Sequence, residues 1–241
     1  KTRVRYFVQF TGYAPPRRVL KGDTVPRYYP VFIDVRDRRC VVIGGGNIGE
    51  EKVHKLLECG ARVAVVSPEV NDGVRDLANN GRVTWEQRQY EPGDLEGAFI
   101  AIAATDDNSV NLAIVKEAEK GNVLLNVVDV THLCTFIAPS VVRKGDVTVA
   151  ISTSGLSPAL ARKLREELEV NSVLDYAELA PMLSEVRLEL RAEGARVDPE
   201  HWQACLNQDI LTMYHSDKNA AKKSLKAALI QGVKAGQVST R

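Results

Sequence analysis

Short apolar runs alternate with amphipathic segments between about residues 38 and 137. Apolar runs with almost no interruption occur in RCVVIG, ARVAVVSP, AFIAIAAT and NVLLNVVD. Such runs are typical of parallel strands that helices cover on both faces. RVTWEQR is a weaker run and predicts a strand nearer the edge. Strands alternating with helices over short loops predict an α/β fold with a doubly wound parallel sheet.

The segment NIGEEKVHKLLECG follows the first apolar run and predicts a helix. Its apolar positions recur at helical spacing, so we expect them to face the sheet. These positions are Ile48, Val53, Leu56 and Leu57.

The pattern changes beyond residue 138. Residues 146–153 (DVTVAIST) alternate strictly between apolar and polar positions, which predicts a half-buried strand outside the first sheet. Ser157 and Pro158 then fit the N-cap and first position of a helix. The apolar stripe of this helix is Leu160, Leu164 and Leu168.

Only helical patterns follow Val170. Pro181 predicts that a helix begins or kinks there, because proline breaks the bonding of a helix interior. A basic amphipathic helix ends the chain. The apolar stripe of the helix near Pro181 is Leu179, Leu183, Val186 and Leu190.

Charge and cysteine content narrow the classes of protein. The 241 residues carry a formal net charge of +1, which gives no general reason to expect nucleic-acid binding. Residues 1–29 hold seven basic side chains against one acidic one, so this leader is either a solvated extension or an arm that contacts a partner. No segment is long and apolar enough for a membrane span. The 4 cysteines are far apart, which fits reduced thiols in the cytoplasm.

Three glycines between the first strand and the first helix fit G-x-G-x-x-G, the dinucleotide-binding pattern of Rossmann-like folds. Gly44 would allow the tight turn, Gly46 would let the backbone approach a pyrophosphate, and Gly49 would let helix and strand pack closely. The helix N-terminus would add unpaired N–H groups and partial positive charge. A glycine-rich turn that binds nothing is the alternative.

The same pattern expects an acid about 20 residues on, for the ribose hydroxyls. Glu69 lies 69 − 49 = 20 positions after Gly49, just beyond Pro68. No arginine occupies the strand end to meet a 2′-phosphate, since Arg75 already falls in the next helix, and this favours NAD over NADP. The alternative for Glu69 is a solvated residue at the start of that helix.

Two further loops end at the carboxyl edge of the predicted sheet, where ligands bind in such folds. Thr105 lies in AATDD, whose small residues would let a cofactor lie close. Asn126 and Asp129 end the fifth strand, and Asp129 is available for proton transfer or for holding a cation. A turn or helix-cap aspartate is the alternative.

Four ordered motifs carry a resemblance: residues 28–70 with the glycine loop, AIAATDD, residues 126–153 beginning NVVDVTHLC, and SPALARKLREELE. Together the chain resembles the precorrin-2 dehydrogenase family, the siroheme-synthase dehydrogenase and ferrochelatase modules. The resemblance implies NAD-dependent oxidation of precorrin-2 to sirohydrochlorin, followed in some members by Fe²⁺ insertion. It also implies a homodimer.

The resemblance assigns roles by position. Asn47 and Ile48 would join the glycine loop in holding the pyrophosphate, Pro68 and Glu69 would flank the adenosine, and Asp129 would serve dehydrogenation and metal insertion alike. Asn126 and the turn STSGLSP would bind the carboxylates of the tetrapyrrole through Ser152, Ser154 and Ser157. Ser154 departs from the glycine that the family often has there.

His132 is expected to be a surface histidine. The sequence has no His and Cys cluster with metal-ligand spacing, which suits Fe²⁺ as a transient substrate rather than a resident metal.

The expected organisation has four parts: a basic N-terminal extension (1–27), an NAD-binding Rossmann domain (28–137), a dimerisation region (138–170) and a C-terminal helical domain (171–241). Two other functions stay open. One is a regulatory NAD-sensing module without catalysis, and the other is a chelatase that does not use NAD.

Overall fold

The computed structural model describes residues 28–238, with side chains described as far as Gly232, so the basic extension at 1–27 lies outside the described residues. A five-stranded parallel sheet occupies the first half of this range, in the order β3-β2-β1-β4-β5. The weak strand β3 is at the edge, as predicted. The strands are β1 (Arg39–Gly45), β2 (Arg62–Val70), β3 (Val83–Glu86), β4 (Ile100–Ala103) and β5 (Leu124–Val127).

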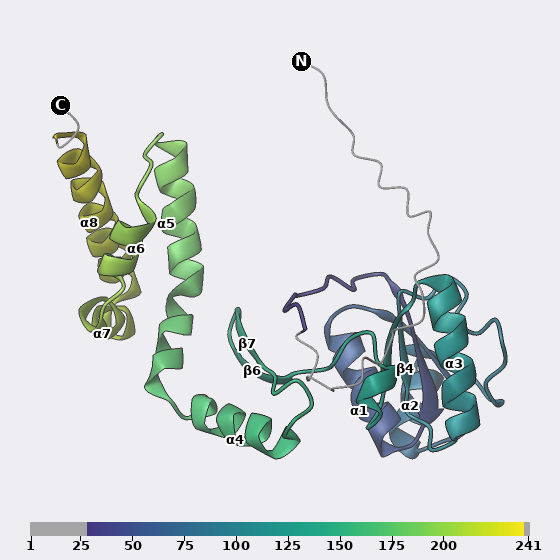
Figure 1. Cartoon of the computed structure of the whole chain (residues 1–241). Helices are drawn as coiled ribbons and strands as arrows, with labels where there is room; N and C mark the ends of the chain where they lie inside the picture. The colour runs from purple at the N-terminus through teal and green to yellow at the C-terminus, as the bar shows by residue number, and fades with distance from the viewer. Residues whose placement is uncertain (1–27, 239–241) are drawn as a thin grey trace.

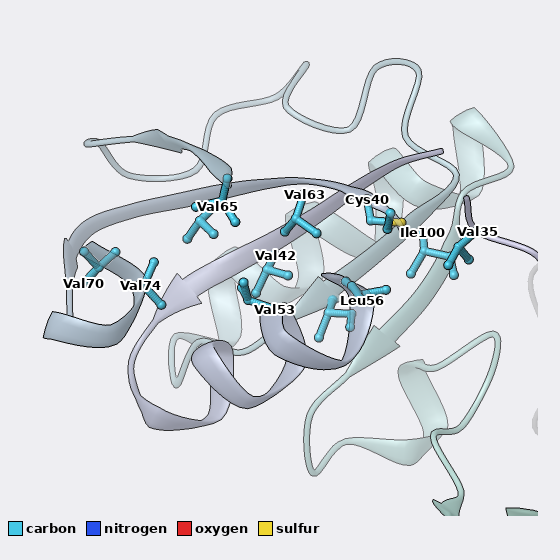
Figure 2. Close-up of a cluster of buried hydrophobic side chains, with 13 residues drawn as sticks. Val35, Cys40, Val42, Val53, Leu56, Val63, Val65, Val70, Val74 and Ile100 are labelled. Carbon is cyan, nitrogen blue, oxygen red and sulfur yellow. The ribbon is translucent and has the colours of Figure 1, made fainter. Parts of the chain in front are cut away.

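Helices cover both faces of the sheet (Figure 1). They are α1 (Asn47–Glu58), α2 (Asp72–Asn79) and α3 (Asn108–Gly121). Because successive side chains of a strand point to opposite faces, β1 supplies Val42 to one core and Val41 to the other. Figure 2 shows Val53 and Leu56 of α1 directed toward the sheet on the Val42 side. The predicted doubly wound α/β fold is confirmed.

The prediction for α1 is wrong at one position. Val53 and Leu56 are buried and Leu57 is partly buried, but Ile48 is 48% exposed. Ile48 lies in the first turn of α1, where the neighbouring Gly49 is the residue that packs against β1. Its apolar side chain therefore faces solvent.

An antiparallel hairpin follows the sheet, formed by β6 (Ser140–Lys144) and β7 (Val147–Ile151). The half-buried strand predicted at 146–153 is β7, whereas β6 was not predicted. Helix α4 (Pro158–Glu169) comes next, and the Ser157 hydroxyl accepts a hydrogen bond from the Leu160 N–H at 3.2 Å, so the predicted N-cap is confirmed. In the apolar stripe of α4, Leu160 and Leu164 are exposed and Leu168 is half-buried.

The remaining helices share a third core, separate from the two beside the sheet. Helix α5 begins at Ala180 with Pro181 in its first turn, and its predicted stripe packs inward, with Leu179, Val186 and Leu190 fully buried. These elements are the 3₁₀ helix η2 (Ser172–Leu179), α5 (Ala180–Ala192), α6 (Pro199–Cys205), α7 (Gln208–Ser216) and α8 (Lys218–Val238).

Ion pairs connect the hairpin to the elements on either side of it. Arg143 of β6 lies 3.3 Å from Glu58 at the end of α1. Lys144 lies 2.6 Å from Asp175 and 3.3 Å from Glu178, both in η2. These contacts link the sheet, the hairpin and the helical part of the chain. In Figure 1 the hairpin lies between the other two. Among the described residues, no helix combines the length and apolar character needed to cross a membrane.

Candidate functional site

The three glycines of the G-x-G-x-x-G pattern, at the junction of β1 and α1, have different surroundings. Gly44 has φ +106°, and a Cβ atom there would lie 2.3 Å from the carbonyl oxygen of Ala104. A Cβ on Gly49 would lie 2.3 Å from the carbonyl oxygen of Gly44. A Cβ on Gly46, in contrast, would meet no atom within 4 Å. Gly44 and Gly49 are therefore required by packing, while Gly46 leaves open space in front of the backbone, as a bound pyrophosphate would need.

Helix α1 begins in that open space. Its N-cap is Gly46, which has extended backbone angles and makes no side-chain cap hydrogen bond. The first-turn N–H groups, at Asn47 and Ile48, therefore remain available for an anion. Asn71, at the end of β2, holds the loop by donating from its backbone to Gly45 O at 2.9 Å and from its side chain to Asn47 Oδ1 at 3.2 Å.

Pro68 and Glu69 lie near the end of β2, and both are exposed. Glu69 belongs to the strand rather than to the start of α2, which begins at Asp72. Two hydrogen bonds fix this stretch: the Ser67 hydroxyl donates to Glu69 O at 2.6 Å, and Trp85 Nε1 donates to Ser67 O at 2.9 Å. The backbone of Glu69 is thus held at the strand end where the adenosine ribose is expected.

Arg75 corrects part of the argument from sequence. It lies in α2, as predicted, but its Nη2 donates to Val70 O at 3.2 Å, so its guanidinium returns to the end of β2. The guanidinium carbon also lies 5.3 Å from the centroid of the Trp85 ring. The expectation that no arginine stands at this strand end is therefore wrong.

Thr105 lies directly beside the glycine loop. A Cβ on Gly44 would come within 3.4 Å of the Thr105 nitrogen. The Thr105 hydroxyl accepts a hydrogen bond from the Asp107 N–H at 3.2 Å, and its carbonyl accepts one from Asn111 Nδ2 at 3.1 Å. Thr105 therefore lies beside Gly44, on the β4 side of the glycine loop.

A cleft of about 280 Å³ lies beyond the end of β5. One wall comes from the end of β5 and the other from the end of β7 and the start of α4. The structure brings Asp129, Asn126 and Ser152 to this cleft, together with Lys52 of α1. Residues that are distant in the sequence thus meet at one cleft.

Asp129 projects from a tight turn. Its φ is +59°, in the left-handed region that aspartate tolerates better than most residues. The turn is closed by a hydrogen bond from the Val130 N–H to Val127 O at 3.2 Å. The buried Cys134 sulfur lies 3.2 Å from both the nitrogen and the oxygen of Val127 and 3.5 Å from Val130 O, so it supports the turn from beneath. Asp129 itself is exposed.

The serines of the turn STSGLSP have different roles: one lines the cleft, while others stabilise the local backbone. Ser152 lines the cleft, and its hydroxyl accepts a hydrogen bond from the Ser154 N–H at 3.0 Å. Ser154 has φ +55° and Gly155 has φ +84°. Neither Ser154 nor Ser157 is among the residues that line the cleft, and the Ser157 hydroxyl caps α4. The left-handed angle of Ser154 explains why a glycine would suit this position.

Lys52 is the cleft residue that sequence reasoning missed. Its side chain is only 18% exposed, and its Nζ lies 3.2 Å from Glu51 Oε1. Lys55, with Lys52, holds the pKa of the Glu51 carboxyl below its usual value. The helical pattern identifies only the apolar positions of α1, and nothing in the sequence indicates that a loop more than seventy positions later lies beside Lys52.

No group of three or more His, Cys, Asp or Glu side chains is placed to hold a metal ion within residues 28–238. His132 is exposed on the 3₁₀ helix η1 (Thr131–Leu133) and does not line the cleft.

The sheet order and the open glycine loop define the class of protein: an NAD(P)-binding protein of the Rossmann type. A family model described as "Putative NAD(P)-binding" matches residues 31–140. A second, described as "Sirohaem biosynthesis protein central", matches residues 144–171. Both models agree with the resemblance to the precorrin-2 dehydrogenase and siroheme synthase family drawn from the sequence, and that resemblance is confirmed.

Individual relatives agree with this assignment. The chain is 44% identical over 158 residues to the siroheme synthase of Methylobacillus flagellatus, a match covering 66% of this chain and 34% of the relative. It is 34% identical over 209 residues to that of Nitrosococcus oceani, covering 86% of this chain and 45% of the relative. The chain thus spans less than half the length of these relatives.

A solved structure described as SirC, precorrin-2 dehydrogenase, shares the fold. It superimposes with a TM-score of 0.62 at 24% sequence identity, over 86% of this chain and all (100%) of that one.

Proposed function

We propose that this chain oxidises precorrin-2 to sirohydrochlorin with NAD as the acceptor. The observation that carries the proposal is the placement of Asp129 at the same sheet edge as the open glycine loop. Backbone bonds join the three strand ends, from Ala104 N to Ile43 O at 2.8 Å and from Val128 N to Ala103 O at 2.9 Å. Two strand spacings, about 10 Å, therefore separate β1 from β5.

Different residues of this chain would bind the pyrophosphate and the ribose of the cofactor. The first turn of α1 would hold the pyrophosphate, and Glu69 would accept hydrogen bonds from the ribose hydroxyls. Bound NAD supplies the hydride acceptor. The proposed preference for NAD rests on Glu69, since a carboxylate repels a 2′-phosphate, whereas Arg75 would attract one.

Asp129 would accept the proton that the macrocycle loses together with its hydride, so that the substrate gives up two hydrogens as one hydride and one proton. Lys52, at the wall of the same cleft, would pair with a carboxylate side chain of the substrate and orient the ring. Ser152 would donate a hydrogen bond to another carboxylate. Metal insertion into sirohydrochlorin is the second candidate, because it too requires a base at the edge of the ring to accept the pyrrole protons.

We also infer that two copies of the chain associate. Helix α4 and its flanking residues expose an apolar surface that nothing within residues 28–238 covers, formed by Leu156, Leu160, Leu164, Val170 and Val173. Exposed apolar patches of this kind mark interaction sites, and twofold dimers are the commonest oligomers. The range 138–170 would form most of this interface, with Val173 of η2 at its border, between the cofactor-binding domain (28–137) and the helical domain (171–241).

Asp129→Asn is the direct test. It keeps the size and the turn geometry, because asparagine also tolerates left-handed backbone angles. Turnover of precorrin-2 with NAD, followed through the sirohydrochlorin absorbance, should fall by about 10²–10⁴-fold, the usual contribution of a positioned general base. NAD binding and the melting temperature should stay close to wild type.

Asp76→Asn is the matched control. Asp76 is exposed on α2, so this substitution removes the same charge at a position away from the cleft. Near wild-type turnover in Asp129→Asn would show that Asp129 is only a turn residue. Wild-type protein that binds NAD without any turnover would favour the NAD-sensing module, and Fe²⁺ insertion without NAD would favour the chelatase. Faster turnover with NADP than with NAD would refute the cofactor choice.

A further inference from the structure

A second, larger groove lies on the helical part of the chain, along α5 and the segment leading into α6. Its volume is about 920 Å³, and it shares no lining residue with the cleft at Asp129. Six side chains determine its character, and we call it the arginine groove: Leu183, Arg187, Arg191, Arg196, Val197 and Trp202.

The acidic and basic side chains of α5 point to different neighbours: the acids toward α8 and the arginines toward the groove. Glu185 and Glu189 of α5, and Glu193 at its C-cap, pair with Lys222 and Lys226 of α8 at distances of 2.6–2.9 Å. These ion pairs use the carboxylates of α5 in contacts within the helical part of the chain. The acids are therefore not available to neutralise cations on the groove side.

The three arginines of the groove, in contrast, have no carboxylate partner among the described residues. Arg187 and Arg191 are one helical turn apart on α5, and Arg196 follows in the next loop, with all three exposed. Guanidinium groups bind carboxylates through two parallel hydrogen bonds, a geometry that lysine does not offer. The groove thus presents three donors of this kind without an internal acceptor.

Apolar surface lies beside these arginines. Trp202, Leu183 and Val197 are partly buried and pack against the helical core, while part of each lines the groove. An indole ring supports a flat aromatic or conjugated ligand by stacking. The combination favours a flat molecule that carries several carboxylates.

We propose that the arginine groove binds a carboxylate-bearing tetrapyrrole, as a second site separate from the cleft at Asp129. The choice of a tetrapyrrole as the ligand rests on the proposed function, whereas the preference for a flat molecule with several carboxylates rests on the groove itself. Ligand pockets for compounds of drug size measure about 300–1,000 Å³. At about 920 Å³ the groove can accommodate a whole macrocycle, whereas the cleft of about 280 Å³ takes only one edge of it.

Tryptophan fluorescence provides the test, because the chain has 2 tryptophans and only Trp202 lies in the groove. In a Trp85→Phe background, uroporphyrin III, a stable ring with carboxylate side chains, should quench Trp202 in a saturable titration. A cationic N-methylpyridyl porphyrin of the same ring size should not. Arg187→Gln combined with Arg191→Gln should weaken uroporphyrin binding at least about tenfold, since two charge-assisted contacts are lost.

Single substitutions give a matched comparison. Arg191→Gln should weaken binding more than Lys223→Gln, which removes the same charge from an exposed position on α8. Binding should also weaken as salt rises from about 0.05 to about 0.5 M, because exposed charges are screened. This measurement needs no substitution in the groove, and together with the single variant Arg191→Gln it keeps the proposal testable even if the double variant fails to fold.

Absence of quenching, or equal quenching in the arginine variants and the control, would overturn the proposal. A loss of dimer in sedimentation with the arginine variants, without any tetrapyrrole present, would show instead that the groove is an interface between copies. Failure of the proposed function would look different. Asp129→Asn should leave the quenching of Trp202 unchanged. A protein that binds uroporphyrin without oxidising precorrin-2 would support the arginine groove and refute the proposed dehydrogenase activity.

Discussion

Gly46 and Gly49 give a paired test of how the glycine loop works, because alanine at each position should fail in a different way. At Gly49 the added Cβ would lie 2.3 Å from Gly44 O, more than 1 Å closer than an ordinary van der Waals contact of 3.4 Å or more. Helix α1 must then move away from β1. Over-packing of this kind costs about 1–3 kcal/mol, so Gly49→Ala should lower the free energy of unfolding by about that amount.

At Gly46 the added Cβ meets no protein atom, and the backbone angles, φ −78° and ψ −172°, are accessible to alanine. Alanine is a poorer N-cap than glycine, which should cost only about 0.5–1 kcal/mol of stability. The methyl group, however, would occupy the space proposed for the pyrophosphate. Loss of two hydrogen bonds to a charged group, roughly 1.5–3 kcal/mol each, should weaken NAD binding by about 100-fold or more.

Both variants can be measured by the same two assays: NAD titration in a calorimeter and urea unfolding followed by circular dichroism. Gly46→Ala should fold almost as well as wild type and bind NAD poorly, while Gly49→Ala should unfold at lower urea concentration. Undiminished NAD affinity in Gly46→Ala would refute the placement of the pyrophosphate. A Gly49→Ala protein as stable as wild type would show that the contact with Gly44 is easily relieved.

Three further predictions follow from other parts of the molecule. Ser154→Gly should raise the free energy of unfolding by about 0.5–1 kcal/mol, because glycine adopts a φ of +55° without the steric penalty of a Cβ atom; urea unfolding checks this, and a less stable variant would contradict it. Leu160→Glu combined with Leu164→Glu should convert a dimer into 26.5 kDa monomers in sedimentation, and a wild-type protein that is already monomeric would rule out the proposed interface. Hydrogen bonds from two lysines of α8 lower the pKa of Glu189 from 4.5 to about 2, so its contribution to stability is complete above about pH 4.5 and is lost as the pH falls toward 2. Glu189→Gln should therefore reduce the loss of stability over that pH range, measured by circular dichroism, and an unchanged acid dependence would count against the pairing.

The sheet could be predicted because most of its strands are recognisable from their local composition. Buried parallel strands require unbroken apolar runs, and β1, β2, β4 and β5 have them. Strand β6 could not be predicted in the same way. Its sequence, Ser140–Lys144, has no regular alternation, and its conformation depends on pairing with β7, which places Val142 opposite Val149.

The candidate site shows the same division between local and distant information. Asp129 was identifiable because it directly follows an apolar strand, and carboxyl ends of parallel strands meet at one edge. Lys52 was not, since its approach to the cleft depends on where the turn after β7 lies relative to α1. Arg75 was placed correctly in its helix, but the reach of its side chain back to Val70 O depends on rotamers that no sequence pattern encodes.

The left-handed turns at Asp129 and Ser154 have a consequence for directed evolution of this protein. Each non-glycine residue in that region of backbone space stores on the order of 1–2 kcal/mol of strain, and both turns border the same cleft. A selection for heat resistance alone would find glycine at these two positions among its earliest gains. At Ser154 such a change would leave the Ser152 hydroxyl in place, whereas at Asp129 it would remove the carboxylate. Thermostable descendants should therefore be screened for turnover as well as for melting temperature, because one of the two easiest routes to stability passes through the proposed base.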